Sequence, residues 1–325
     1  MKLGILGGGS WATAIAKILT DNGDKINWWV RNEEQAEHIR KHKHNPKYLT
    51  SVEFLDGELE LITDLDEFIA NTEVIIVATP SAFIHSVLEG KNLDGHKIVS
   101  AVKGIIPEFN LIPAHYFSEK HGIPMSDIAI ISGPCHAEEV AMEKLSYLTI
   151  ASEDAELSKL IADQMDGRYI RCSVSDDLVG TEISAVLKNV YALACGVAHG
   201  LGYGDNYMAV LVSNAIQEIE MFIDHAYPLH RDVKQSAYLG DLLVTAYSLH
   251  SRNRRFGNLL GKGYSLNAVK QEMNMVAEGY YAAACINELA AQHNIELTIA
   301  NTVYEMLYKQ VSPKSAFAEL SKKLY

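Results

Sequence analysis

A glycine-rich turn near the start of the sequence constrains the fold more than any other feature. Residues 2–6 form a short apolar run typical of a β-strand, and the motif Gly7-Gly8-Gly9-Ser10-Trp11-Ala12 leads from it into a helical pattern that ends near Gly23. In this G-x-G-x-x-A spacing, Gly7 permits a tight turn, Gly9 lets a pyrophosphate approach the backbone, and Ala12 allows close helix–strand packing. The N–H groups that begin such a helix can hold a diphosphate. An ordinary turn is the alternative, but the flanking strand and helix favour dinucleotide binding.

Strand and helix patterns alternate through the first half of the chain, and strand signals stop near Ser175. The later strand patterns cover residues 25–30, 73–79, 97–102, 128–131, 146–152 and 168–172. Beyond them, helical patterns cover residues 209–226, 241–250, 266–272, 276–293 and 298–308. Alternation of this kind predicts a parallel, doubly wound sheet, and a length of 325 residues suggests two domains. We therefore predict an α/β, Rossmann-like domain over residues 1–176 and an all-α substrate domain over residues 177–325.

The segment Glu182–Asn206 reads as a helix that is apolar on nearly every side, which is typical of a buried helix. Lys188 and Asn189 lie in its middle, with no acidic residue one turn away from the lysine. Burial of an unpaired ammonium is costly and lowers its pKa. Lys188 is therefore either a lysine whose head group reaches solvent or an active-site amine.

Composition excludes several classes of partner. A net charge of −13 argues against general binding to nucleic acids or anionic membranes, and we find no apolar run long and uncharged enough to cross a bilayer. The cysteines form no CxxC pair, which fits a reducing cytoplasm, and the histidines show no metal-ligand spacing, so we expect no metal. Because the chain begins directly with a strand pattern, we expect no signal peptide.

Local groups of cations must then bind any anionic ligand. Lys103 follows the strand at residues 97–102, where parallel strands face a ligand crevice. Arg31 stands at the end of the second strand, in place of the acidic residue that grips the ribose of NAD, so NADP should be accepted; a solvated arginine with NAD as cofactor is the alternative. The run Ser251-Arg252-Asn253-Arg254-Arg255 offers bidentate phosphate recognition, or is merely a solvated face. Asp241 could accept a hydrogen bond from Lys188, or could instead cap a helix.

These segments together resemble the bacterial NAD(P)-dependent sn-glycerol-3-phosphate dehydrogenases over essentially the whole chain. The matching segments are GILGGGSWATAIA, VATPS, AVKGI around Lys103, SGP at residues 132–134, AVLKNVYALACGVAHGLGYGDN, LGDLLVT, SRNRRFG and VAEG. The resemblance implies a Rossmann domain, a helical substrate domain, NAD or NADP as cofactor, and interconversion of dihydroxyacetone phosphate and glycerol 3-phosphate for phospholipid synthesis. It also implies a homodimer.

The resemblance assigns roles residue by residue. It implies that Lys188 is the proton donor and acceptor and that Lys103 contacts both cofactor and substrate. Substrate-binding residues would be Gly133, Cys135, Asp241, Ser251, Arg252 and Asn253, and cofactor-binding residues Ser10, Trp11, Arg31, Ala137, Arg252 and Glu278. The sequence departs from the family at Cys135, where a serine or threonine is usual, and a thiol is a weaker hydrogen-bond donor than a hydroxyl.

The required chemistry agrees with this assignment. Reduction of a ketone needs a hydride from nicotinamide and a proton for the developing alkoxide. A lysine in an apolar helix, near the second cation Lys103, should have a lowered pKa suited to proton transfer and should stabilise the oxyanion. Asn189 and Thr245 could orient the lysine, or could equally be satisfied core polar groups. Two other functions remain open: a β-hydroxyacid dehydrogenase acting on a carboxylate, and a non-catalytic dinucleotide sensor.

Overall fold

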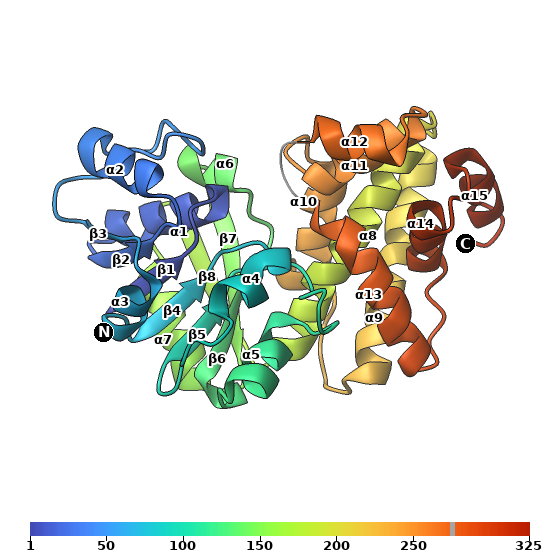
Figure 1. The fold of residues 1–325 in the computed structure, drawn as a ribbon. Coiled ribbons are helices and arrows are strands. Elements are labelled where there is room, and N and C mark those ends of the chain that lie inside the picture. The colour runs from blue at the N-terminus through green and yellow to red at the C-terminus, as the bar shows by residue number, and fades with distance from the viewer. Residues whose placement is uncertain (274–276) are drawn as a thin grey trace. The chain divides into compact units, whose positions relative to one another are not determined.

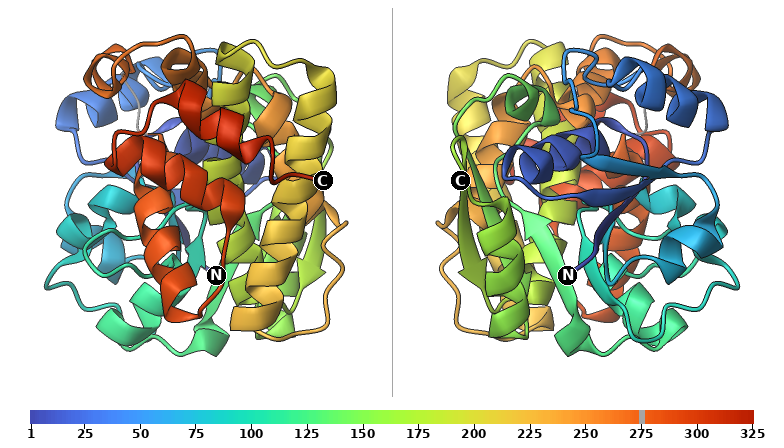
Figure 2. Two further views of the ribbon diagram at one scale, coloured as in Figure 1. Left: turned by 90° about the vertical axis from the view of Figure 1, so that its right-hand side faces the viewer. Right: turned by 90° about the vertical axis from the view of Figure 1, so that its left-hand side faces the viewer.

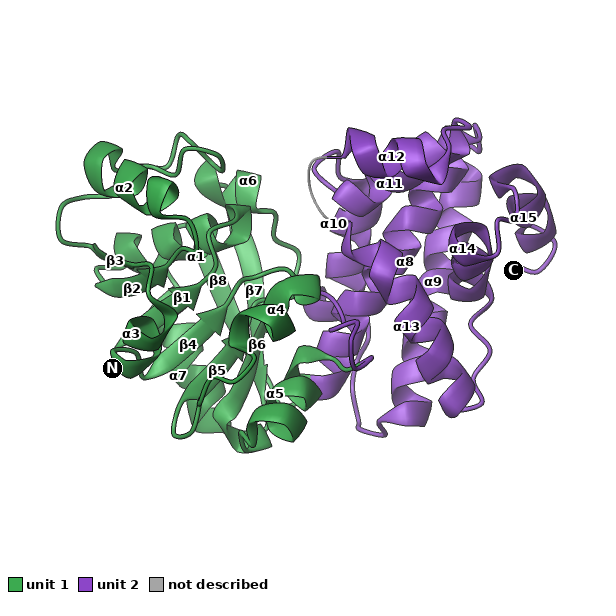
Figure 3. Cartoon of the chain, in the orientation of Figure 1, with its two compact units in different colours: residues 1–102, 111–178 green, residues 103–110, 179–325 purple. Residues whose placement is uncertain are grey.

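The structure, a computed structural model, describes residues 1–273 and 277–325 and divides into two compact units. Unit 1 comprises residues 1–102 and 111–178, and unit 2 comprises residues 103–110 and 179–325 (Figure 3). The short segment 103–110 thus counts with unit 2, although the chain on either side of it belongs to unit 1. The domain boundary expected between residues 176 and 177 stays a prediction.

Unit 1 contains one sheet in the order β3-β2-β1-β4-β5-β6-β7-β8 (Figure 1). Its strands are β1 (Leu3–Leu6), β2 (Ile26–Trp29), β3 (Leu59–Ile62), β4 (Val74–Val77), β5 (Lys97–Ser100), β6 (Ile128–Ser132), β7 (Ser146–Ser152) and β8 (Ile170–Ser175). All neighbours pair in parallel except β6 and β7, which are antiparallel. The predicted doubly wound sheet is confirmed, with two corrections: its direction reverses between β6 and β7, and β3 was not predicted.

The strand order of the sheet changes direction at β1. The next strands along the chain, β2 and β3, extend the sheet on one side of β1, whereas β4 pairs with its other side. Ligands of doubly wound sheets bind outside the carboxyl ends of the strands at such a switch point. The glycine turn follows β1 directly and therefore lies at this position.

The helices of unit 1 connect these strands. They are α1 (Ser10–Asp21), α2 (Glu33–His42), α3 (Leu65–Ala70), α4 (Ser81–Leu88), α5 (Pro113–His121), α6 (Ala137–Ala141) and α7 (Ala155–Met165). Helix α2 shows why they form locally: the side chain of Asn32 caps its first turn, acidic residues begin it and basic residues end it. The core of the unit contains fully buried side chains such as Ile5, Ile15, Trp28 and Val99.

All regular elements described in unit 2 are helical (Figures 1 and 2). They are α8 (Leu178–Gly200, whose first residue counts with unit 1), α9 (Asp205–Ala226), a π-helical turn (Ser236–Gly240), α10 (Asp241–Tyr247), α11 (Arg252–Gly261), α12 (Leu266–Glu272), α13 (Glu278–Gln292), α14 (Thr298–Tyr308) and α15 (Pro313–Leu320). The all-α prediction is confirmed for this unit. Val276, where we expected α13 to begin, lies outside the described residues.

Helix α8 corrects one expectation. Its length and apolar composition would suffice to cross a membrane, contrary to our finding of no such run. However, 94% of its most apolar window is buried inside the protein. A buried core helix passes the same test, so this feature is weak evidence for a membrane span.

Glycines let α8 approach its neighbours backbone to backbone. A Cβ atom on Gly196 of α8 would collide with the carbonyl of Arg254, and one on Gly257 of α11 with the carbonyl of Leu193. A Cβ atom on Gly279 of α13 would lie 2.5 Å from the carbonyl oxygen of Asn189. Helices α11 and α13 therefore fit against the part of α8 that follows Lys188.

Candidate active site

The ammonium group of Lys188 is buried and paired. The residue is 5% exposed, and its Nζ donates to Oδ1 of Asp241 at 2.6 Å and to Oγ1 of Thr245 at 2.8 Å. Asp241 and Thr245 are one turn apart on α10, and Thr245 Oγ1 donates in turn to the carbonyl of Asp241 at 2.7 Å. The alternative in which the lysine head group reaches solvent is therefore wrong, because α10 supplies both of its acceptors.

A second lysine shares the same carboxylate. Nζ of Lys103 donates to Oδ2 of Asp241 at 2.9 Å, so each oxygen of Asp241 accepts from a different ammonium. The backbone of Lys103 is held as well, because Nδ2 of Asn189 donates to its carbonyl oxygen at 2.6 Å. The predicted catalytic set of Lys103, Lys188, Asn189, Asp241 and Thr245 thus forms one hydrogen-bonded network within unit 2.

Burial and charge determine how this network ionises. Burial lowers the pKa of Lys188 to about 8; the carboxylate of Asp241 opposes this shift, whereas the nearby Lys103 adds to it. Burial alone would raise the pKa of Asp241, but the charges of Lys103 and Lys188 outweigh it and hold that pKa below its ordinary value. Asp241 is therefore a stable anion, and Lys188 can give up a proton near physiological pH.

The arginine-rich run begins a helix rather than forming a uniform exposed face. Ser251 caps α11 by accepting from the backbone N–H of Arg254, and the exposed Arg255 lies 3.6 Å from Glu272. Asn253 is 7% exposed and accepts from the backbone N–H of Gly279 at 2.9 Å. Because this bond uses the amide oxygen of Asn253, its Nδ2 is the atom suited to an anion. Arg252 is half-buried at the first position of α11.

The glycine turn of unit 1 has a shape that fits a diphosphate. Gly7 has φ +133°, and a Cβ atom there would lie 2.9 Å from the backbone of Ala78. At Gly9, which precedes α1, an added Cβ would meet no atom within 4 Å, so the space above it is open. The N–H groups of the first helical turn, which have no acceptor within a helix, begin at this opening.

Side chains that the sequence analysis missed hold this turn. Nε1 of Trp28 donates to the carbonyl of Gly7 at 2.6 Å, while Nε2 of Gln35 and Nδ2 of Asn45 donate to the carbonyl of Gly8 at 2.8 and 3.2 Å. Bonding to the protein turns these carbonyls away from a ligand and leaves the N–H face for an anion. Trp28 lies in an apolar strand and Asn45 beyond a helix, so no local spacing marks either residue as part of the turn.

The remaining predicted residues divide between the units. Ser10 is buried and Trp11 half-buried at the start of α1; Arg31 is exposed after β2, and Ala137 begins α6. Gly133 has φ +108°, and the half-buried Cys135 packs against the core of unit 1. Glu278 begins α13 in unit 2. Among residues 1–273 and 277–325 there is no group of three or more His, Cys, Asp or Glu side chains that could hold a metal ion.

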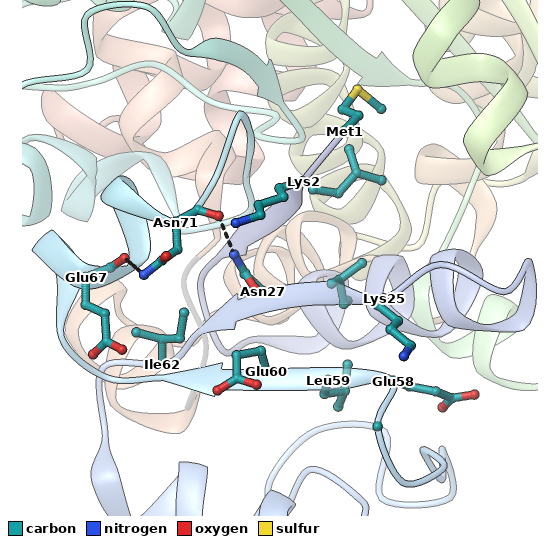
Figure 4. A pocket seen from close by; sticks show the side chains of 13 residues that line it. Met1, Lys2, Lys25, Asn27, Glu58, Leu59, Glu60, Ile62, Glu67 and Asn71 are labelled. Atoms are coloured by element: carbon teal, nitrogen blue, oxygen red, sulfur yellow. Dashed lines mark hydrogen bonds between the residues drawn. The ribbon is translucent and has the colours of Figure 1, made fainter.

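A hollow of about 500 Å³ lies at the end of the sheet opposite the glycine turn, near the amino ends of the strands (Figure 4). It is bordered by Lys2 and Lys25 and by the acidic residues Glu58, Glu60 and Glu67, where β1, β2 and β3 begin. Because nucleotides bind at the carboxyl ends of such strands, this hollow is not the dinucleotide site.

Comparison with known proteins places the chain among dehydrogenases. Its residues 2–158 match the model of the NAD-dependent glycerol-3-phosphate dehydrogenase N-terminus, and residues 177–318 match that of the C-terminus. Glycerol-3-phosphate dehydrogenase [NAD(P)+] of Oceanobacillus iheyensis is 33% identical over 98% of this chain and 93% of its own. The enzyme of Geobacillus thermodenitrificans is 35% identical over 97% and 93%.

Solved structures agree with the sequence comparison. The crystal structure of glycerol-3-phosphate dehydrogenase from Coxiella burnetii has a TM-score of 0.91 and 28% identity, covering 98% of both chains. A complex of D-mandelate dehydrogenase with NADH has a TM-score of 0.65 at 13% identity over 97% of this chain and 100% of that one, which shows the fold alone.

Proposed function

Because the chain belongs to the family of NAD-dependent glycerol-3-phosphate dehydrogenases, we propose that it reversibly reduces dihydroxyacetone phosphate to sn-glycerol 3-phosphate with NADH or NADPH. The observation that carries the proposal is the buried amine of Lys188, held by Asp241 and Thr245. Such an enzyme supplies glycerol phosphate for phospholipid synthesis. We further propose a cytoplasmic homodimer with domains at residues 1–176 and 177–325.

The glycine turn of unit 1 would hold the cofactor. Gly7, Gly9, Ser10 and Trp11 would receive the diphosphate at the open N-terminus of α1. Further contacts would come from Arg31, Lys103, Ala137, Arg252 and Glu278. When bound, the nicotinamide supplies the hydride.

Lys188 would move the proton. With a pKa of about 8, it is mostly protonated at pH 7 and can donate from Nζ to the oxygen of the substrate carbonyl. Lys103 would place a second positive charge near that oxygen and stabilise negative charge as it develops. Asp241 would keep the two ammonium groups together, and Asn189 would fix the backbone of Lys103.

The substrate phosphate needs donors, because the protein as a whole carries a charge of −13. Arg252, Asn253 and Ser251 at the start of α11 would provide them, with Nδ2 of Asn253 directed by the bond that its amide oxygen already makes to Gly279. We place Gly133 and Cys135 at the substrate as well.

The deciding experiment is cofactor oxidation with dihydroxyacetone phosphate, comparing the wild-type protein with Lys188→Ala. We expect turnover by the wild type, and a loss of kcat of at least about 10³-fold in the variant while NADH still binds, because general acid catalysis contributes about 10²–10⁴-fold and the oxyanion also loses a charge. Lys234→Ala, at an exposed lysine of unit 2, is the control and should leave the rate unchanged.

Two outcomes would overturn the proposal. Oxidation of 3-hydroxy acids without activity on dihydroxyacetone phosphate would indicate a β-hydroxyacid dehydrogenase. Cofactor binding with no turnover of either substrate would indicate a dinucleotide sensor. An unaltered rate in Lys188→Ala would remove the lysine from the mechanism.

A further inference from the structure

The segment that carries Lys103 has two ends, and the catalytic network accounts for only one of them. Residues 103–110 follow β5 and precede α5, both in unit 1, yet they belong to unit 2. Asn189 and Asp241 hold Lys103 itself. A segment fixed only at its first residue would still leave a flexible lysine side chain with many orientations, so the contacts at its far end matter.

Asn110 fixes the far end. Its Nδ2 donates to Oε2 of Glu288 at 2.6 Å, and its Oδ1 accepts from Sγ of Cys285 at 2.9 Å. Burial raises the pKa of the Cys285 thiol to about 11, so the thiol keeps the proton that this bond needs. Cys285 and Glu288 are three residues apart on α13 and so lie on one face of that helix.

The backbone at this position suits asparagine. Asn110 has φ +54°, in the left-handed region that asparagine tolerates better than most residues. It ends a turn over residues 107–110 in which the N–H of Phe109 donates to the carbonyl of Ile106 at 3.2 Å. The side chains of Ile105 and Ile106, between the turn and Lys103, are buried. The chain between Lys103 and Asn110 therefore has little conformational freedom.

The helix that holds Asn110 also contacts the catalytic network. Gly279, near the start of α13, packs against the carbonyl of Asn189 and donates its N–H to Asn253. Asn189 in turn holds the carbonyl of Lys103. The contacts from Asn110 through α13 to Asn189 and back to Lys103 therefore form a closed ring within unit 2.

We propose that Asn110 is a positioning residue, which ties the segment 103–110 to α13 and thereby holds the ammonium of Lys103 against Asp241. The role in catalysis rests on the proposed function, whereas the placement of Lys103 does not.

Displacement of Lys103 has a measurable consequence at its neighbour. Lys103 contributes to the lowering of the pKa of Lys188, so its departure from Asp241 must raise that pKa above about 8. A change that merely loosened the fold would reduce activity without shifting the titration of Lys188. The titration therefore separates a positioning role from a structural one.

The test compares Asn110→Gly with the wild type. Glycine accepts the positive φ but removes both side-chain bonds. We expect kcat/KM for dihydroxyacetone phosphate to fall about tenfold or more, since small displacements of a catalytic group can cost up to about a hundredfold. The alkaline limb of the pH–rate profile should move to higher pH, in the same direction as in Lys103→Met. Asn294→Gly, at an exposed asparagine with φ +55° in the same unit, is the matched control and should change neither.

A second readout does not need activity. Competitive labelling with acetic anhydride across a pH range, followed by mass spectrometry, reports the titration and reactivity of each lysine. In Asn110→Gly we expect Lys188 to titrate at higher pH and Lys103 to react faster. Glu288→Ala, which changes an exposed side chain and leaves the core intact, should give a smaller shift in the same direction.

The outcomes distinguish the two proposals. A wild-type protein without activity on dihydroxyacetone phosphate, but with the expected labelling shifts in the variants, would end the proposed function and keep the positioning role. The positioning role would be overturned if Asn110→Gly and Glu288→Ala both left the labelling of Lys188 and Lys103 and the alkaline limb of the pH–rate profile unchanged, whether or not activity falls.

Discussion

Two buried carboxyl groups of unit 2 have opposite ionisation behaviour. Asp241 is 1% exposed and faces the ammonium groups of Lys103 and Lys188, which lower its pKa. Glu218 is 8% exposed and faces the hydroxyl of Tyr191 at 3.1 Å and the backbone N–H groups of Ile299 and Ala300 at 2.7 and 3.4 Å. Burial raises the pKa of Glu218 to about 7, although these hydrogen bonds oppose the shift. Similar burial thus gives a permanent anion where cations are supplied, and a titrating acid where they are not.

The two groups also serve different purposes. Asp241 gathers the lysines of the candidate active site. Glu218, from α9, accepts from the first turn of α14, a helix whose own N-cap residue Leu297 provides no side-chain cap. Glu218 therefore acts as a cap supplied by another helix. The charged site suits catalysis and the titrating site suits packing, and substitutions should separate the two.

The largest effect should follow Asp241→Asn. The amide keeps the shape of the carboxylate but leaves two ammonium groups without their anion. Because Asp241 raises the pKa of Lys188, its loss should move that pKa below about 8, so the lysine is less protonated at pH 7.5. We expect kcat/KM for dihydroxyacetone phosphate reduction to fall roughly 10²–10⁴-fold, with the alkaline limb at lower pH. A pH–rate profile measures both, and an unmoved limb would show that Asp241 does not control Lys188.

A smaller effect, on stability alone, should follow Glu218→Gln. The pKa of Glu218 is about 7 in the folded protein, above the ordinary value of 4.5, so the folded state binds more protons between these values. Stability contributed by this group is present at low pH and is lost as pH rises through 7. The free energy of unfolding of the glutamine variant, minus that of the wild type, should therefore rise by about 1–3 kcal/mol from pH 5 to pH 8.

Urea unfolding at both pH values measures this difference. The pH–rate profile of Glu218→Gln should match that of the wild type, because Glu218 does not contact the lysine network. A stability difference that is the same at pH 5 and pH 8 would contradict a titrating Glu218.

The two carboxyl groups also differ in how well the sequence predicts them. Asp241 could be matched to Lys188 because a lysine in an apolar helix needs an anion and Asp241 itself stands in an apolar run. Glu218 lies in an ordinary helical pattern, and two of the groups that donate to it, the N–H groups of Ile299 and Ala300, are about eighty residues away. No local signal marks it as buried, since burial there depends on how α9 and α14 pack.

Dependence on distant contacts also explains which parts of the fold the sequence predicted and which it did not. The glycine turn at Gly7 is a local motif, so the sequence predicts it well. Strand patterns do not encode direction, so the antiparallel pairing of β7 with β6 could not be anticipated. Strand β3 is as short as β1 and β4, but only its last two residues are buried, so it lacks the continuous apolar run by which those strands were predicted. The sequence also placed Lys103 only at the end of a strand. Its membership of unit 2 depends on distant partners at Asp241 and Asn189.

The smallest effects should come from the hydroxyl partners of the two sites, Thr245 and Tyr191. Thr245→Val removes an acceptor of Lys188, and Tyr191→Phe removes a donor to Glu218. Thr245→Val loses two hydrogen bonds and Tyr191→Phe loses one, each bond worth about 0.5–1.5 kcal/mol. For Thr245→Val the loss should include a fall in kcat/KM of roughly 2–10-fold, because the amine is oriented less well. Tyr191→Phe should lower stability with kcat/KM unchanged, and should raise the pKa of Glu218 further, since the tyrosine lowers it. Tyr191 is only three residues from Lys188 on α8, so it tests the comparison closely: if Tyr191→Phe slowed turnover as much as Thr245→Val, the packing site and the catalytic site would be one coupled network.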